Sequence, residues 1–171
     1  MKYNLINVID FEMLQSDKPE IVQVGITVVD METMMIVKKT GFYIKPERME
    51  HYTADFFQLT GIKKRLIEKG FPLHRGIEIL NNKHGLKNRP FVSFGKDWKQ
   101  LIDECHDKNI EIEINNVFDL SLFWMIFHKE EANISLANLL QKNNIDFEGR
   151  QHNAEDDAYN TAKLLLKIIT D

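Results

Sequence analysis

The stretch VIDFEML, residues 8–14, places two acidic residues inside an apolar run. Apolar residues flank them on both sides, which is typical of a central strand with both faces covered. Because side chains on a strand alternate between faces, Asp10 and Glu12 point the same way, with Cα atoms roughly 6.5–7 Å apart. Like charges buried together are costly without a cation, and a divalent metal compensates them most directly. The alternative is a strand with one solvated face.

Length and composition indicate one ordinary globular domain, residues 1–171. The single cysteine, Cys105, excludes an internal disulfide and suits a reducing compartment. The N-terminus is too short and too acidic for a secretory signal, and no apolar stretch reaches the ~20 residues of a membrane span. We therefore expect a cytoplasmic protein. A net charge of −4 argues against binding nucleic acid by bulk charge, but not against gripping a strand end through bound cations.

The hydrophobic patterns predict strands first, and then strands alternating with helices. Residues 46–61 read as a loop with one short helix. This order predicts a mixed α/β sheet covered by helices. We expect strands at residues 2–11, 21–29, 34–44, 91–94 and 117–120, and helices at residues 72–81, 96–108, 122–128, 135–142 and 154–169.

The stretch QHNAEDDAYNTAKLL, residues 151–165, joins a histidine to the acids of the last predicted helix. His152 and Asp157 would lie ~140° apart if both were helical. They converge only if His152 precedes the helix, and Asn153 is a suitable N-cap for that arrangement. The first two acids are explained by the helix dipole alone. For Asp157 the local pattern leaves a site role and a solvated first turn equally open.

The stretch FVSFGKDWKQL, residues 91–101, ends a strand and begins a helix. Gly95 forms the turn and can also mark a close approach of the backbone. Asp97 opens the helix, where an acid commonly serves as a cap or faces the dipole. Whether Asp97 is only a cap or part of a site therefore depends on the other acids.

Taken in order, these residues resemble the DEDDh 3′–5′ exonucleases: an acid pair on the first strand, an acid at a later strand-to-helix turn, and His-x4-Asp at the terminal helix. EIVQVGITVVD, residues 20–30, is similar to the second strand of that family, and QLTGI, residues 58–62, matches its Leu-Thr-Gly-Ile signature. Residues 135–165 are similar to its C-terminal third. The resemblance spans nearly the whole chain and is greatest to the branch of small-RNA and histone-mRNA exonucleases and KapD-like proteins.

The resemblance implies a ribonuclease-H-like fold, a mixed five-stranded sheet flanked by helices, and five catalytic positions. It implies two divalent ions, Mg²⁺ or Mn²⁺. Asp10 would bridge both ions, Glu12 and Asp157 would complete one site, and Asp97 would hold the other. A histidine accepts a proton from water, since the ordinary histidine pKa is near 6.5. The implied products are nucleoside 5′-monophosphates from a 3′ end. The five positions are Asp10, Glu12, Asp97, His152 and Asp157.

The sequence departs from the family pattern at two places next to the predicted catalytic acids. MLQSDKPE, residues 13–20, replaces the Ala-Thr-Cys-Trp segment common in the eukaryotic branch. The turn from Gly95 to Asp97 is one residue shorter than in many relatives. Asp103 lies too far along the predicted helix to replace Asp97.

The resemblance also places the terminal nucleotide of the substrate against apolar side chains, which stack on or wedge unpaired bases without reading sequence. Ordinary core packing is an equal alternative for Leu59. A basic run at residues 63–65 either meets phosphates or forms a solvated helix face. The expected substrate-binding residues are Met13, Leu14, Leu59, Thr60 and, for a phosphate, Arg150.

Other reactive side chains are expected to be structural. The two tryptophans and Cys105 are expected in the core. The remaining five histidines are expected at surface or loop positions rather than as ligands. They are His51, His74, His84, His106 and His128.

Two other functions fit parts of the pattern. One is a catalytically weak or inactive exonuclease-fold module that binds RNA ends or a protein partner, and the other is a nuclease that cuts internally. The complete set of five positions disfavours the first, and Leu-Thr-Gly-Ile with His-x4-Asp disfavours the second. The substrate implied by the branch is the 3′ end of single-stranded RNA rather than DNA, with no membrane partner.

Overall fold

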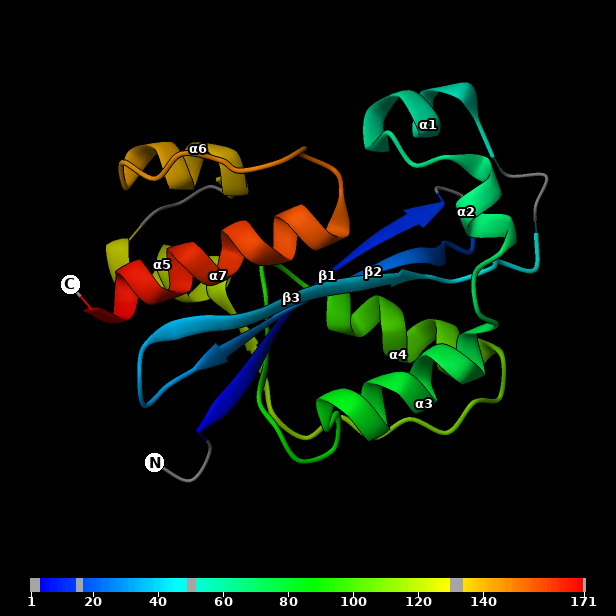
Figure 1. Ribbon diagram of the computed structural model, residues 1–171, viewed down its shortest axis with the longest axis horizontal. Helices are drawn as coiled ribbons and strands as arrows, with labels where there is room; N and C mark the ends of the chain where they lie inside the picture. The colour runs from blue at the N-terminus through cyan, green and yellow to red at the C-terminus, as the bar shows by residue number, and fades with distance from the viewer. Residues whose placement is uncertain (1–3, 15–16, 49–51, 130–133, 171) are drawn as a thin grey trace.

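The computed structural model describes residues 4–14, 17–48, 52–129 and 134–170. Within them, one five-stranded sheet has the order β3-β2-β1-β4-β5. Strands β3, β2 and β1 pair antiparallel, whereas β1, β4 and β5 pair parallel. This is the predicted mixed sheet flanked by helices (Figure 1). The strands are β1 Leu5–Leu14, β2 Glu20–Asp30, β3 Met35–Tyr43, β4 Phe91–Ser93 and β5 Val117–Asp119.

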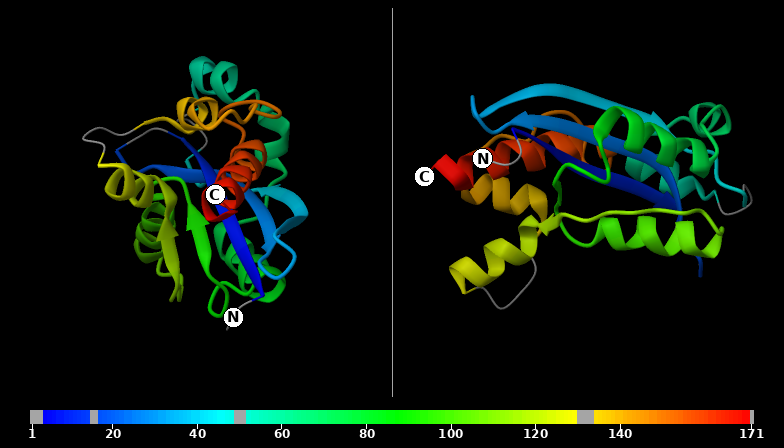
Figure 2. Two further views of the ribbon diagram at one scale, coloured as in Figure 1. Left: turned by 90° about the vertical axis from the view of Figure 1, so that its left-hand side faces the viewer. Right: turned by 90° about the horizontal axis from the view of Figure 1, so that it is seen from below.

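Helices cover both faces of the sheet (Figures 1 and 2). Helices α3 and α4 lie on one face, and α5, α6 and α7 lie on the other, while α1 and α2 pack beyond the end of β1. Within the described residues no helix has the length and apolar character to cross a membrane. The helices are α1 Ala54–Thr60, α2 Lys64–Glu68, α3 Leu73–His84, α4 Asp97–Asp107, α5 Leu120–His128, α6 Leu136–Lys142 and α7 Ala154–Thr170.

Strand β1 is the centre of the sheet, as the acid-containing stretch predicted. Ile9 and Phe11 pack into the core formed with α3 and α4. Val8 packs into the core formed with α5, α6 and α7. Because side chains alternate, Asp10 and Glu12 face α7. The strand continues to Leu14, three residues beyond the predicted end, so both acids lie within it.

Helices α1 and α2 fill most of the predicted loop and its basic continuation. Thr53 caps α1 by accepting from the Phe56 N–H, and Gly61 ends it with φ 70. Lys64 begins α2 and lies 3.9 Å from Glu68 in an exposed pair. The basic run is therefore exposed at the start of α2, which fits both of its predicted alternatives.

The remaining elements follow the predictions with shifted ends. Helix α3 continues three residues beyond residue 81, to His84, and Gly85 caps it in the left-handed region at φ 63. His84 is therefore in the helix and 3% exposed, so its expected surface position is wrong. Asp119 caps α5, which begins two residues earlier than predicted. The predicted cap of α6, Ser135, accepts the Asn138 N–H.

The structural assignments of the other side chains largely hold. Cys105 and Trp124 are buried, as expected, while Trp98 is only partly buried. His74, His106 and His128 are exposed, as predicted, and His51 lies outside the described residues.

Candidate active site

Three carboxyl groups converge where β1 meets the beginning of α7. Oxygen atoms of Asp10, Glu12 and Asp157 lie within 4.8 Å of one another. Asp97, in the first turn of α4, hydrogen-bonds to Asp10 and accepts the backbone N–H of Phe11. The structure thus brings all four predicted acids together, including Asp97 after its shortened turn.

A close approach of α7 to the sheet brings Asp157 to this point. Gly25 on β2 pairs with Asp10 on β1. A Cβ at Gly25 would overlap with the carbonyl group of Ala154, so only glycine lets the helix start here. Next to it, the Gln23 carboxamide accepts the Ala154 N–H at 3.1 Å. These contacts fix the first turn of α7 over the acids of β1.

Asp156 also stabilises the beginning of α7, through contacts on the solvent side of the helix. Its carboxylate lies 2.5 Å from Lys39 Nζ on β3 and accepts the Arg150 N–H at 2.9 Å. Asn153 is the N-cap, as predicted, since its side chain accepts the Asp156 N–H at 3.4 Å. Asp156 is therefore structural, although its specific partners go beyond the helix dipole.

His152 precedes α7, which is the arrangement that convergence with Asp157 required. Its φ of 61 lies in the left-handed region, where a side chain other than glycine or asparagine is strained. The backbone N–H groups of His152 and Asn153 donate to the Asp157 carboxylate. The exposed His152 side chain lines the cavities on either side of the acids.

A tight turn presents Asp97, and Asp119 maintains it. The Asp119 carboxylate accepts the Gly95 N–H at 3.0 Å, while Ser93 Oγ donates to the Gly95 carbonyl at 2.7 Å. Gly95 has φ 109, a conformation that favours glycine. The sequence analysis missed Asp119. The signal that could have revealed Asp119 is its position at the end of a strand parallel to β4.

Burial and mutual repulsion disfavour ionisation of the four acids. Burial, then the neighbouring carboxyl groups, raise the pKa of Asp10 well above its usual value. Burial, then Asp157 and Asp97, raise the pKa of Glu12 to about 8. Burial is also the main cause that raises the pKa of Asp157 to about 7 and that of Asp97 to about 6.

This donor set fits divalent metal ions. The charges that raise the pKa values of Asp10 and Glu12 are all carboxylates. Clustered carboxylate oxygens are the hard ligands that Mg²⁺ and Mn²⁺ prefer. A bound cation would offset both the burial and the repulsion, so the acid cluster is a candidate metal site.

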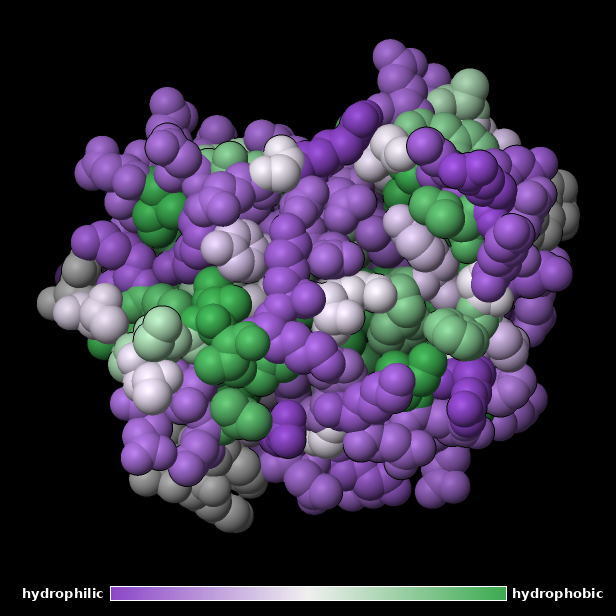
Figure 3. Space-filling view, in the orientation of Figure 1, coloured by the Kyte–Doolittle hydropathy of each residue, from purple (hydrophilic) through white to green (hydrophobic). Residues whose placement is uncertain are grey.

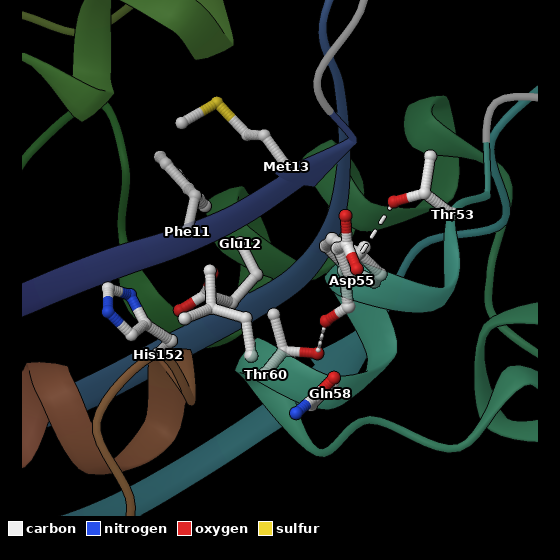
Figure 4. Close-up of a pocket in the computed structure, with 10 residues that line it drawn as sticks. Phe11, Glu12, Met13, Thr53, Asp55, Gln58, Thr60 and His152 are labelled. Atoms are coloured by element: carbon white, nitrogen blue, oxygen red, sulfur yellow. Dashed lines mark hydrogen bonds between the residues drawn. The ribbon is translucent and has the colours of Figure 1, made fainter.

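A cavity of about 850 Å³ opens beside the cluster, between β1 and α1 (Figure 4). Glu12 and His152 line it together with Met13, Leu59 and Thr60, three of the predicted substrate-binding residues. Leu59 is 54% exposed, so the alternative of ordinary core packing is wrong for it. Sequence reasoning missed further lining residues, which carry no motif of their own. They are Phe11, Thr53, Asp55, Phe56 and Gln58.

The structure corrects one predicted substrate contact and gives another residue a structural role. Leu14 is 1% exposed and packs with Val22 and Phe56, because the register shifts between Glu12 and Met13 and ends the simple alternation. The Arg150 guanidinium donates to the carbonyls of Gln58 and Leu59, at 2.5 and 3.2 Å. It ties α1 to the segment before α7, and its contact with a phosphate stays a prediction.

Comparison with known proteins places the chain in a family. The RNase_T family model, described as Exonuclease, matches residues 7–165. The chain belongs to this exonuclease family. It is 26% identical to mouse "ERI1 exoribonuclease 2" over 99% of its length, but spans only 29% of that relative. It is also 26% identical to Drosophila "3'-5' exonuclease Snipper", covering 99% of this chain and 70% of the fly protein.

Solved structures confirm the fold. The nuclease domain of 3'hExo, described as a DEDDh family member bound to rAMP, superposes with a TM-score of 0.85 at 19% identity, over 99% of this chain and 93% of that one. A 3'-exonuclease structure concerned with histone mRNA stem-loop recognition gives a TM-score of 0.85 at 18% identity. This superposition covers 100% of this chain and 84% of the other chain. The family match confirms the resemblance to the exonucleases, and the superpositions confirm the predicted fold.

Proposed function

We propose that the protein is a metal-dependent 3′–5′ exonuclease that releases nucleoside 5′-monophosphates from single-stranded nucleic acid, RNA in preference to DNA. The observation that carries the proposal is the convergence of Asp10, Glu12 and Asp157 within 4.8 Å, beside a cavity of nucleotide size. Relatives named exoribonucleases support the RNA preference. The proposal treats residues 1–171 as one catalytic domain and places it in the cytoplasm, where a single reduced cysteine is expected.

The four acids would hold two ions, Mg²⁺ or Mn²⁺. Asp10 faces the other three acids and is suited to bridge both ions. Glu12 and Asp157 would complete one site, and Asp97 the other. When bound, such ions neutralise phosphate charge, activate water and stabilise the leaving oxygen.

His152 would receive the proton of the attacking water. It stands between the acid cluster and the main cavity, and its exposed imidazole is accessible to water and substrate. Helix α7 begins two residues after it, and the backbone N–H of His152 donates to the Asp157 carboxylate, so the position of its backbone is held. The strained φ of 61 is the cost of this position.

The main cavity would hold the terminal nucleoside. Met13 and Leu59 offer apolar surface for an unpaired base. The Thr60 hydroxyl donates to the Phe56 carbonyl and accepts the Ile62 N–H, so it stabilises the end of α1 rather than reading a base. The cavity would therefore be tolerant of sequence.

A degradation ladder tests the proposal. The purified protein is incubated with 5′-labelled single-stranded RNA or DNA, in Mg²⁺, in Mn²⁺ or in chelator. We expect stepwise shortening from the 3′ end that chelator and Asp157→Asn abolish, with RNA shortened faster. A circular or 3′-phosphorylated RNA should resist. Its cleavage would indicate an internal nuclease, and no cleavage of any substrate by folded, metal-loaded protein would indicate the non-catalytic binding module.

A further inference from the structure

A second groove leaves the acid cluster on the side opposite the main cavity. Its first part, about 210 Å³, is lined by Asp10, Asp157 and His152. A neighbouring cavity of about 520 Å³ lies between α6 and the segment before α7, and Phe147 and Gln151 line both parts. In Figure 1, α1 and α6 stand on opposite sides of the beginning of α7. The acids thus lie between two openings, and His152 lines both of them.

Uncharged carboxamides dominate the far part of this groove. Asn138, Gln141, Asn144 and Gln151 all line it. Within the residues that the structure describes, none of these four side chains makes a hydrogen bond. The surface over α6 is mainly hydrophilic (Figure 3). Four free carboxamides gathered on one cavity can each donate and accept a hydrogen bond.

The path of a substrate strand links the two openings. If the terminal nucleoside occupies the main cavity and its phosphate lies at the acids, the rest of the strand must leave on the other side. We propose that the carboxamide groove binds the bases of the second and third nucleotides from the 3′ end. This inference rests on the proposed exonuclease function.

The chemistry of the groove favours bases over phosphates. None of the residues that line its far part is a lysine or arginine, and Asp146 adds a carboxylate that would repel phosphate. Carboxamides pair with the donors and acceptors of base edges, and the Phe147 ring offers a stacking surface. Because these contacts need unpaired base edges, the groove selects a single-stranded 3′ end of at least three nucleotides.

A length series tests this proposal with the double variant Gln141→Ala/Asn144→Gly. Glycine suits position 144, where φ is 56, and alanine suits the helix at position 141. The measured quantity is kcat/KM on a four-nucleotide RNA divided by kcat/KM on a p-nitrophenyl ester of uridine 5′-monophosphate, which carries no second or third base. Loss of two carboxamide contacts should lower this ratio roughly tenfold to thirtyfold.

The matched control, Asn82→Ala/Asn88→Ala, removes two exposed carboxamides on the other side of the sheet and should leave the ratio unchanged. Urea unfolding of each variant shows that it is folded. An unchanged ratio in the folded groove variant would overturn the inference while leaving the exonuclease intact. If the wild type hydrolyses neither substrate, the proposed function fails, and the inference fails with it.

Discussion

Replacing Glu12 by glutamine should stabilise the metal-free protein at alkaline pH. The pKa of Glu12 is raised to about 8, mainly by burial, from 4.5. The folded state therefore keeps a proton that the unfolded state releases, and the free energy of unfolding falls as pH rises from about 4.5 to 8. The difference between the two pKa values is equivalent to about 5 kcal/mol of unfolding free energy. Because the Glu12 side chain is only partly buried, solvent screening reduces the expected gain in stability to about 1–3 kcal/mol.

The assay is urea unfolding in chelator at pH 4.5 and pH 8.5, followed by tryptophan fluorescence. Wild type and Glu12→Gln should be equally stable at the lower pH, and the variant more stable at the higher one. Glu111→Gln, an exposed acid with the same charge change, is the control. Added Mn²⁺ should stabilise the wild type more than the variant, because bound metal stabilises only the folded state. A Glu12→Gln variant less stable than wild type in chelator at pH 8.5 would refute the electrostatic account.

Three further substitutions test how the site is built. Gly25→Ala should cost about 1–3 kcal/mol in unfolding free energy and weaken Mn²⁺ binding measured by calorimetry, since the new methyl group displaces α7 and with it Asp157. His152→Asn should leave unfolding within about 1 kcal/mol of wild type, because asparagine tolerates positive φ, yet lower kcat roughly a hundredfold. Arg150→Ala should raise KM by loosening α1, as judged by steady-state kinetics, whereas the exposed control Arg75→Ala should not.

The strands and the acid cluster were predictable because their signals are local. Alternation alone set Asp10 and Glu12 on one face, and helix geometry required His152 to lie before α7. The resemblance supplied Asp97, whose cap-like position carries no unique signal. The mixed sheet followed from the order of strand and helix patterns.

The features that the sequence did not reveal come from contacts between distant parts of the chain and from the end of one helix. The register shift after Glu12 depends on pairing with β2, and it turns Leu14 into the core. Arg150 meets carbonyls about ninety residues earlier in the chain, which no local pattern reveals. His84 is the last residue of α3 and is buried, although the sequence pattern ended the helix at residue 81, and helix ends are the least certain part of any sequence-based prediction.

The most direct test of the metal-site account is the rate at which Asp10→Asn releases nucleoside monophosphate from 5′-labelled single-stranded RNA in Mn²⁺. Asparagine keeps the shape of the side chain but removes the carboxylate that the other three acids face. Asp103→Asn makes the same charge change on the exposed side of α4. We predict a loss of at least roughly a hundredfold for Asp10→Asn and wild-type rates for Asp103→Asn. A folded Asp10→Asn protein that cleaves at the wild-type rate would contradict the account.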